Sequence, residues 1–335
     1  MSADSPDESV DLLIVGGGPT GISIAAEATR AGVDALIVEK GPLLASLLDF
    51  PRDMVFFTTR ERLEIADVPF AIPDPKPTRR QAVSYYHGVA RRYELALALH
   101  ERVERIEPTE GGFLVTGVGS DGRRLRRAHA VAMATGYYDN PNRLGVDGEE
   151  LPWVAHRFDE PLRHFDETVL VVGGGNSAVE AAMELWRSGA RVTLVHRGEA
   201  VRPSVKYWLR PDFENRVEEG SIAARYGTVV TAFRPDGRIE LEGEDGHMEM
   251  EVDAAYVLIG YQPDMTLLSR AGVAVDAESL VPEVDQTTCE SNVPGLYVAG
   301  TLQAGRDTNR IFIENSRDHS SRIVNHLAAR LRARA

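Results

Sequence analysis

Short runs of apolar residues recur along the chain and are separated by polar or glycine-rich stretches. Runs of roughly four to eight residues rich in Val, Ile, Leu and Ala are typical of strands buried on both faces of a parallel sheet. They cover residues 11–15, 35–38, 130–134, 168–172, 191–195, 254–259 and 295–300. The pattern therefore predicts a parallel sheet as the framework of the protein.

Stretches with helical periodicity lie between these runs. They cover residues 22–31, 81–93, 179–187, 264–272 and 311–331, and the last is amphipathic and Arg-rich towards its end. Two other stretches alternate apolar and polar positions: residues 105–128 turn at Gly112 and Gly122, and a stretch ending at residue 252 turns at Gly237. Together these patterns predict an α/β fold that combines βαβ units with two antiparallel β-meanders.

The first predicted strand and helix are joined by the sequence GGGPTG at positions 16–21. In a turn of this form Gly16 permits the tight bend, Gly18 lets the backbone approach a pyrophosphate, and Gly21 lets helix and strand pack closely. The helix N-terminus then presents free N–H groups to phosphate. Glu39 ends the second strand, where a carboxylate accepts hydrogen bonds from ribose hydroxyls and repels a 2′-phosphate. The stretch predicts a dinucleotide site.

Residues 41–78 contain six prolines and follow this site directly. So many breakers argue against a long helix, and a long loop in a compact domain is usually functional. One hypothesis is that Phe50, Met54, Phe56 and Phe57 cover a flat ring system, with Thr58 and Thr59 at its polar edge. The alternative is that they are ordinary core aromatics.

The chain then repeats the same unit, with a second glycine turn at 173–178. His196 follows Gly173 by 23 positions, just as Glu39 follows Gly16 by 23 positions. Here His196-Arg197, with Arg202 shortly after, replaces the carboxylate, and cationic donors suit the 2′-phosphate of NADP. Two unequal sites in one chain imply electron transfer from NADPH to a second dinucleotide, for which FAD is the candidate.

After the second unit the chain has to return to the first, so we expect one domain to be inserted in the other. The expected FAD-binding domain comprises residues 1–140 and 262–335, and the expected NADPH-binding domain comprises residues 141–261. Residues 137–151 are Pro-rich and polar and fit a connection between domains.

Composition narrows the remaining possibilities. The 335 residues carry a net charge of −14, which disfavours binding to nucleic acid or to an anionic membrane. No apolar run approaches the roughly 18 residues of a membrane span, and residues 1–9 read as a polar tail, so we expect a cytoplasmic protein. Cys289 is the only cysteine, which excludes an internal dithiol, and we interpret it as inert and partly buried. His156, His164 and His319 lack metal-ligand spacing and are interpreted as surface or capping residues, so no metal is expected.

The turn at 16–21, Ala134-Thr135-Gly136, and the turn at 173–178 ahead of His196-Arg197 resemble the two-dinucleotide flavoprotein reductases of the thioredoxin reductase type, over essentially the whole chain. The strings at 53–59, 76–78, 204–208 and 311–315 are similar to the bacillithiol disulfide reductase branch. The resemblance implies two Rossmann-like domains, each with three layers of helices, parallel sheet and β-meander. It also implies FAD and NADPH as cofactors, a hinge and a homo-oligomer, either dimer or tetramer.

Carried over by position, the resemblance also implies the cofactor-binding residues. The FAD residues are Gly16, Gly18, Pro19, Thr20, Gly21, Glu39, Lys40, Thr58, Val103, Thr135, Gly136, Gly300, Thr301, Ile311 and Phe312, the last two at the start of the final helix. The NADPH residues are Gly173, Gly175, Asn176, Ser177, His196, Arg197, Arg202 and Lys206. Hydride passes between cofactors in such a reductase, so no side chain is expected to act as acid, base or nucleophile.

The sequence departs from the resemblance at three places. No cysteine lies between positions 136 and 173, Thr20 stands where the branch usually has a cysteine, and Thr301 stands where many relatives have an acid. A hydroxyl cannot form a mixed disulfide. The acceptor therefore stays open between a low-molecular-weight disulfide, such as bacillithiol disulfide, and a small redox protein. The alternatives are a ferredoxin or flavodoxin–NADP reductase, and a redox sensor that binds nucleotides without turnover.

Overall fold

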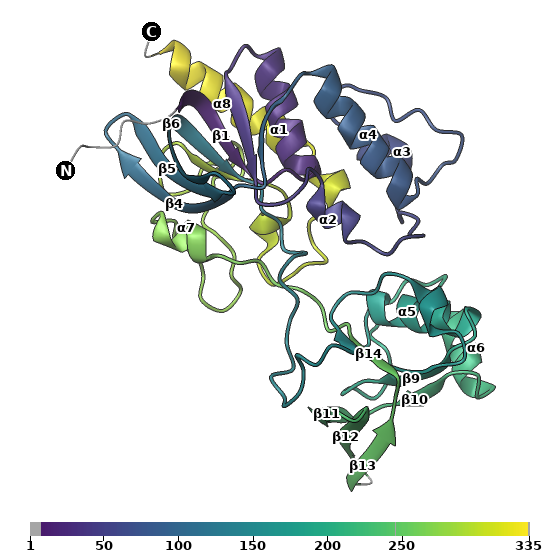
Figure 1. The fold of residues 1–335 in the computed structure, drawn as a ribbon. Helices are drawn as coiled ribbons and strands as arrows, with labels where there is room; N and C mark the ends of the chain where they lie inside the picture. Colours follow the sequence, from purple (N-terminus) through teal and green to yellow (C-terminus); the bar gives the residue numbers. More distant parts are fainter. Residues whose placement is uncertain (1–7, 245, 334–335) are drawn as a thin grey trace. The chain divides into compact units, whose positions relative to one another are not determined.

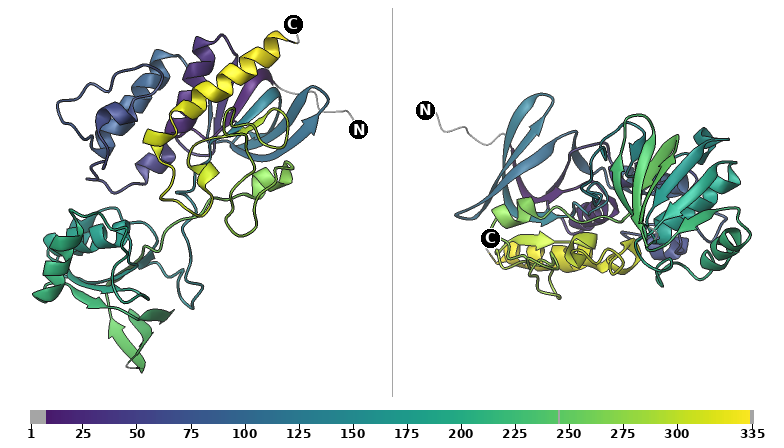
Figure 2. Two further views of the ribbon diagram at one scale, coloured as in Figure 1. Left: turned by 180° about the vertical axis from the view of Figure 1, so that it is seen from behind. Right: turned by 90° about the horizontal axis from the view of Figure 1, so that it is seen from below.

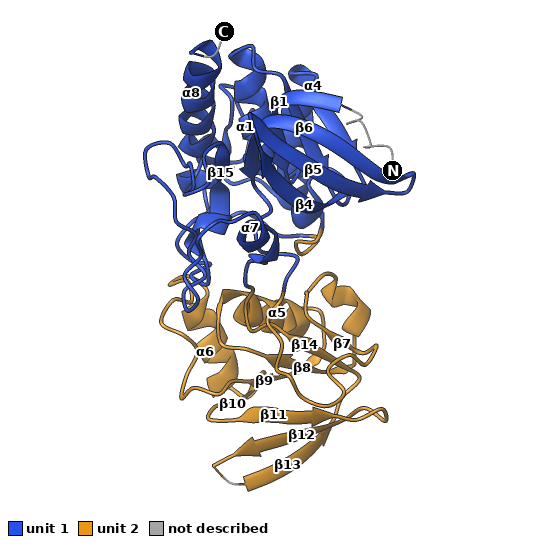
Figure 3. Ribbon diagram, turned by 90° about the vertical axis from the view of Figure 1, so that its left-hand side faces the viewer, with its two compact units in different colours: residues 1–48, 53–140, 262–335 blue, residues 49–52, 141–261 orange. Residues whose placement is uncertain are grey.

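The computed structural model describes residues 8–244 and 246–333, so most of the expected N-terminal tail lies outside the described residues. The chain divides into two compact units (Figure 3). Unit 1 comprises residues 1–48, 53–140 and 262–335, and unit 2 comprises residues 49–52 and 141–261. The main crossings fall between residues 140 and 141 and between residues 261 and 262.

Unit 1 is built on a parallel sheet whose strands are ordered β3-β2-β1-β6, with β15 pairing on the far side of β6 (Figure 1). The strands are β1 (Glu8–Val15), β2 (Ala35–Glu39), β3 (Ala96–Leu99), β6 (Gly122–Met133) and β15 (Leu296–Val298). Val15 stands opposite Val38 and Met133, so the segments after β1, β2 and β6 begin at one edge of the sheet. In open α/β sheets this carboxyl edge is where ligands bind.

Helices pack on this sheet, and the irregular segment predicted at 41–78 contains only short helices. The helices are α1 (Pro19–Arg30), α2 (Ala45–Leu48), α3 (Arg60–Leu63), α4 (Arg79–Arg92), α7 (Thr266–Arg270) and α8 (Asp318–Arg332), with 3₁₀ turns η2 (Gly300–Ala304) and η3 (Ile313–Asn315). Helices α1 and α8 lie side by side, as Figures 1 and 2 show. Across residues 8–244 and 246–333, no helix has the length and apolar content needed to span a bilayer.

The first meander consists of β4 (Arg102–Thr109), β5 (Gly112–Gly119) and the first part of β6. The sequence predicts a third meander strand and a separate buried strand, but the structure has one continuous strand, β6. Its first part pairs with β5 and its second part with β1 and β15. The sequence does not indicate one strand here because residues 123–127 are mostly charged, and charged residues are not expected in a buried strand. Arg126 is nevertheless buried, since it forms ion pairs with Glu101 and Glu8.

The prediction of one helix over residues 311–331 is wrong at its start, because α8 begins at Asp318. The Phe312 N–H donates to Asn315 Oδ1 at 2.7 Å, and the Ser316 hydroxyl donates to the Phe312 carbonyl at 2.7 Å. These side chains satisfy backbone groups that a helix would otherwise use, which favours a turn. Ile311 and Phe312 therefore do not lie at the start of the last helix.

Unit 2 repeats the parallel sheet with the order β10-β9-β8-β14-β7 and carries its meander as a separate sheet, β11-β12-β13. The elements are β7 (Val154–Ala155), η1 (Pro161–His164), β8 (Thr168–Val172), α5 (Asn176–Arg187), β9 (Arg191–Val195), α6 (Arg210–Glu218), β10 (Ala223–Arg225), β11 (Val229–Phe233), β12 (Arg238–Gly243), β13 (Gly246–Glu251) and β14 (Ala254–Val257). Val169 and Val171 pack towards α5, whereas Leu170 and Val172 pack towards the meander. The predicted three layers of helix, sheet and meander are confirmed.

Candidate functional site

The two glycine turns have the same local structure. The Gly16 N–H donates to the Val38 carbonyl and the Gly173 N–H to the Val195 carbonyl, both at 2.9 Å. Both glycines have positive φ, at +111° and +144°. A Cβ on Gly16 would lie 2.5 Å from the Ala134 oxygen, and one on Gly173 would lie 2.4 Å from the Leu258 oxygen. Only glycine fits, because each turn packs against the backbone that follows the strand next to it.

The third glycine of each turn borders open space. Gly18 and Gly175 are the N-caps of α1 and α5, and neither supplies a capping side chain. A Cβ on either would meet no heavy atom within 4 Å. Uncapped N–H groups at a helix start, with room in front of them, are what a pyrophosphate needs. Both turns therefore fit a dinucleotide.

Glu39 is held at the end of β2, beside the first turn. Its carboxylate accepts the Gly17 N–H at 2.6 Å and the Gly41 N–H at 2.8 Å, and the residue is only 8% exposed. A carboxylate has about four lone-pair positions, so two remain for ribose hydroxyls. The neighbouring Lys40 forms an ion pair with Asp139, a contact that lies within unit 1.

His196 occupies the equivalent place in unit 2, but the structure changes its expected role. The residue is 9% exposed, and a Cβ on Gly174 would lie 2.5 Å from its ring. Burial lowers the pKa of His196, and Arg202 and Arg197 lower that pKa further. These effects favour the neutral imidazole, and the expected contact of His196 with a 2′-phosphate stays a prediction. The positive charge comes from Arg197 and Arg202, which are both exposed.

The loop after β9 is fastened to the second glycine turn. The Arg202 N–H donates to the Gly174 carbonyl at 2.7 Å, and the Lys206 N–H donates to Asn176 Oδ1 at 2.9 Å. The Asn176 amide also donates to the Ser204 carbonyl at 3.3 Å. The side chain of Asn176 thus holds the loop at Ser204 and Lys206, and the Gly174 carbonyl holds the same loop at Arg202.

Four segments of unit 1 that are distant in sequence meet at Gly300. Gly300 has a φ of +67°, and a Cβ there would lie 2.7 Å from Thr20 Oγ1. A Cβ on Gly136 would lie 3.6 Å from Thr301 Oγ1. The fourth segment is α8, whose His319 accepts the Gly300 N–H at Nδ1 over 3.1 Å. The fold therefore brings four of the predicted residues together at the carboxyl edge of the sheet.

Sequence reasoning missed the burial of His319, which is 6% exposed and is not a surface residue; its ring accepts the first N–H of η2. A signal was available, since His319 precedes the buried Ile323 and Leu327 at intervals of four and shares their apolar stripe. His156 and His164 are half-buried and hydrogen-bond Glu149 and Tyr256.

Other predicted residues lie apart from these contacts. Thr58 and Ile311 are half-buried, Phe312 is exposed, and Val103 is half-buried in β4. Phe56 is buried, which fits the interpretation of this aromatic as core. These positions stay predictions.

The remaining candidates from the sequence have structural roles. Cys289 is 1% exposed, and burial raises the pKa of its thiol, so its interpretation as inert is supported. Tyr86 is fully buried and its hydroxyl donates to the Leu63 carbonyl at 3.0 Å. Trp208 is 45% exposed and lies edge-on to the ring of Tyr207.

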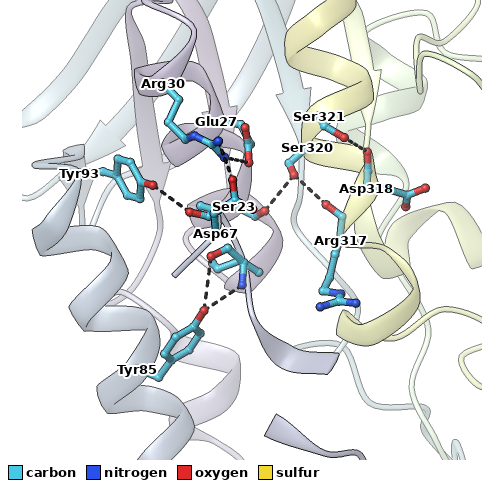
Figure 4. Close-up of polar contacts among 12 residues, drawn as sticks. Ser23, Glu27, Arg30, Asp67, Tyr85, Tyr93, Arg317, Asp318, Ser320 and Ser321 are labelled. Carbon is cyan, nitrogen blue, oxygen red and sulfur yellow. Dashed lines mark hydrogen bonds and ion pairs between the residues drawn. The ribbon is translucent and has the colours of Figure 1, made fainter. Parts of the chain in front are cut away.

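An open cavity of about 510 Å³ lies between α1, α8 and the loop at 64–67 (Figure 4). Arg30 bridges Glu27 at 2.9 Å and Asp67 at 2.6 Å. The Ser23 hydroxyl of α1 donates to the Ser320 hydroxyl of α8 at 3.0 Å. The lining includes five carboxylates and no aromatic ring, so it does not offer the flat apolar walls that a flavin ring needs.

Comparison with known proteins gives four findings. Residues 13–300 match the family described as pyridine nucleotide-disulphide oxidoreductase. The bacilliredoxin reductase Bdr of Bacillus subtilis (strain 168) is 39% identical over 318 residues, which cover 95% of this chain and 97% of that protein. A ferredoxin–NADP reductase of Bacillus licheniformis is 28% identical over 89% of this chain and 83% of that protein. The solved bacillithiol disulfide reductase Bdr from Bacillus cereus superposes with a TM-score of 0.93 at 37% identity, over 96% of this chain and 99% of that one.

Proposed function

Because the chain belongs to the pyridine nucleotide-disulphide oxidoreductase family, we propose that its turn at 16–21 binds FAD and its turn at 173–178 binds NADPH. The chain is an oxidoreductase with FAD and NADPH as cofactors. One observation carries the assignment of the two sites: matching turns, both open to a pyrophosphate, are followed by a carboxylate in unit 1 and by two arginines in unit 2.

In unit 1, the buried Glu39 repels a 2′-phosphate and accepts the hydroxyls of an unphosphorylated ribose, which suits FAD. In unit 2, Arg197 and Arg202 supply charge-assisted donors to the 2′-phosphate of NADPH. A neutral His196 supplies one N–H donor without adding charge. The side chains bind and orient, and bound FAD supplies the ring that accepts hydride from the nicotinamide.

We infer that the acceptor is a disulfide, either a low-molecular-weight one or that of a small redox protein, as the names of the two Bdr relatives suggest. The reaction consumes NADPH and one proton, breaks the S–S bond and forms two S–H groups. Cys289 is buried and position 20 is threonine, so this chain offers no thiol for a mixed disulfide. The disulfide would therefore have to take its electrons directly at the flavin edge.

A second candidate is favoured by the same lack of an accessible thiol. Ferredoxin–NADP reductases pass electrons from flavin to a protein partner without a protein dithiol, and one of them is 28% identical over most of this chain. We therefore keep reduction of a small electron-transfer protein as the alternative.

The test begins with the purified protein, which should be yellow and should lose its flavin absorbance within seconds of anaerobic NADPH addition. A colourless protein that stays colourless after incubation with FAD, or one that NADPH does not bleach, would favour a nucleotide-binding sensor. Steady-state NADPH oxidation with bacillithiol disulfide, compared with ferredoxin-dependent cytochrome reduction, then separates the two enzyme candidates. Light scattering of the same sample tests the expected homo-oligomer.

A further inference from the structure

The buried imidazole of His319 has no part in the cofactor assignment above, yet it contacts the backbone at the centre of the proposed FAD site. His319 is the second residue of α8 and is 6% exposed. Its Nδ1 accepts the N–H of Gly300 over 3.1 Å. Gly300 itself is buried, and a buried N–H that loses its acceptor is costly.

This hydrogen bond fixes the protonation state of the ring. A nitrogen that accepts a backbone N–H carries no proton, so the ring proton sits on Nε2 and the imidazole is neutral. Burial is the main influence on its pKa and lowers it; Asp318 raises that pKa and Arg322 lowers it. Asp318 and Arg322 form an ion pair with each other, and their effects on the pKa of His319 are opposite in sign. Burial therefore determines that this pKa is lowered.

The peptide that His319 holds is conformationally unusual. Gly300 has a φ of +67° at the start of η2, directly beside Thr20 of α1, and Thr301 follows it beside Gly136. If the Gly300 N–H lost its acceptor, the peptide would be stabilised by rotating until this N–H found another hydrogen-bond acceptor. Such a turn would move Thr301 away from Gly136 and change the packing against Thr20.

We propose that His319 is a positioning residue of the FAD site: its neutral imidazole holds the Gly300–Thr301 turn in the conformation that binds the flavin end of FAD. The inference rests on the proposed binding of FAD in unit 1. His319 acts through Gly300 and is given no chemical step. It follows that loss or protonation of the ring weakens FAD binding and leaves the NADPH site of unit 2 intact.

Two substitutions distinguish the effect of losing the hydrogen-bond acceptor from the effect of losing the volume of the ring. His319→Leu removes the acceptor, whereas His319→Asn keeps an acceptor oxygen near the position of Nδ1 and has no charge at any pH. The matched control is His326→Leu, on the same helix, which loses a hydrogen bond to the Tyr297 hydroxyl of 2.9 Å. Each full-length variant is stripped of flavin and titrated with FAD, and binding of 2′,5′-ADP reports the integrity of unit 2.

We expect His319→Leu to weaken FAD binding by about tenfold or more, while His319→Asn and His326→Leu stay within about threefold of the wild type. Because the pKa of His319 lies below its usual value of about 6.5, FAD affinity of the wild type should be full above that pH. It should fall as the pH drops through the lowered pKa, and His319→Asn should lack this fall.

Four results would overturn the inference. They are wild-type FAD affinity in His319→Leu, equal losses in the Leu and Asn variants, an equal loss in His326→Leu, and the same acid fall in His319→Asn as in the wild type. If His319→Leu does not fold, the pH dependence of FAD affinity in the wild type and in His319→Asn still tests the inference. Failure of the wild type to bind FAD at all would instead refute the proposed function, so the two failures are distinguishable.

Discussion

Glu39 is the last residue of β2, Arg197 is the second residue after the equivalent strand β9, and the two carry opposite charges. Glu39 is buried and bound by two backbone N–H groups, so its charge is fixed in position. Arg197 and Arg202 are exposed. Since the pKa of His196 is lowered, the proposed binding of a 2′-phosphate assigns the positive charge to Arg197 and Arg202.

The first prediction concerns these arginines. A charge-assisted hydrogen bond contributes about 1.5–3 kcal/mol. Arg197→Ala or Arg202→Ala should therefore weaken the binding of NADPH by about tenfold or more and leave the binding of NADH nearly unchanged. The KM values for both coenzymes measure this. Arg191→Ala, at the other end of β9, serves as the control. An unchanged NADPH/NADH ratio in both variants would contradict the assignment of unit 2.

At the scale of elements, different glycines of each turn serve the fold and the proposed ligand site. Gly16 is required by the fold because a Cβ there would overlap the Ala134 carbonyl. Gly18 borders open space, since a Cβ there would meet no heavy atom within 4 Å. The same division holds for Gly173 and Gly175.

The second prediction follows from this difference. Gly16→Ala should prevent unit 1 from folding, or destabilise it by several kcal/mol, since its φ is positive and the Cβ has no room. Gly18→Ala should leave the thermal midpoint of the flavin-free protein within a few degrees of the wild type and weaken FAD strongly, because the methyl group stands where the pyrophosphate would lie. Tight FAD binding by Gly18→Ala would show that the turn holds no pyrophosphate.

The third prediction concerns α5. Burial, and then the nearby Glu184, raise the pKa of Glu180 to about 7, against the opposing effect of Lys206. A carboxyl with a raised pKa in the folded state favours folding most at low pH, and this contribution is lost as the pH rises through about 7. Glu180→Gln should therefore increase the free energy of unfolding by about 1–3 kcal/mol at about pH 8.5 and change it little at about pH 5.

Urea unfolding of the wild type and Glu180→Gln at both pH values measures this. Glu218→Gln is the control, because Glu218 lies on α6 and is exposed. An equal effect of Glu180→Gln at the two pH values would mean that the carboxyl keeps its ordinary pKa.

At the scale of the whole molecule, each unit has its own hydrophobic core. The sheet of unit 2 is covered by α5 on one face and by the meander on the other. Both main crossings lie in the connections at 140–141 and 261–262. The short segment 49–52 contributes an exposed ion pair between Asp49 and Arg157, which is worth less than about 1 kcal/mol.

The fourth prediction is that residues 141–261 fold when produced alone and bind 2′,5′-ADP in the absence of FAD. Circular dichroism tests the fold and calorimetry tests the binding. The same fragment with Arg197→Ala should fold equally well and bind more weakly. A fragment that stays unfolded would show that unit 2 depends on unit 1 for stability.

The sequence by itself determined the βαβ units, the two glycine turns and the opposite charges after equivalent strands. These features depend on periodicity and turn chemistry over fewer than about thirty residues, where local preferences are strong. Gly16, Gly173, Glu39 and Arg197 were all found in this way. The repeat also indicated an inserted domain, because a second unit of the same kind needs its own sheet.

The tertiary structure decided everything that depends on distant partners. Arg126 is buried within a continuous strand because Glu101 and Glu8 neutralise it, and α8 starts late because Asn315 and Ser316 bind the turn before it. His196 is neutral and His319 is buried only because other segments cover them. Charge state and burial depend on neighbours far away in the chain, and no local pattern specifies those neighbours.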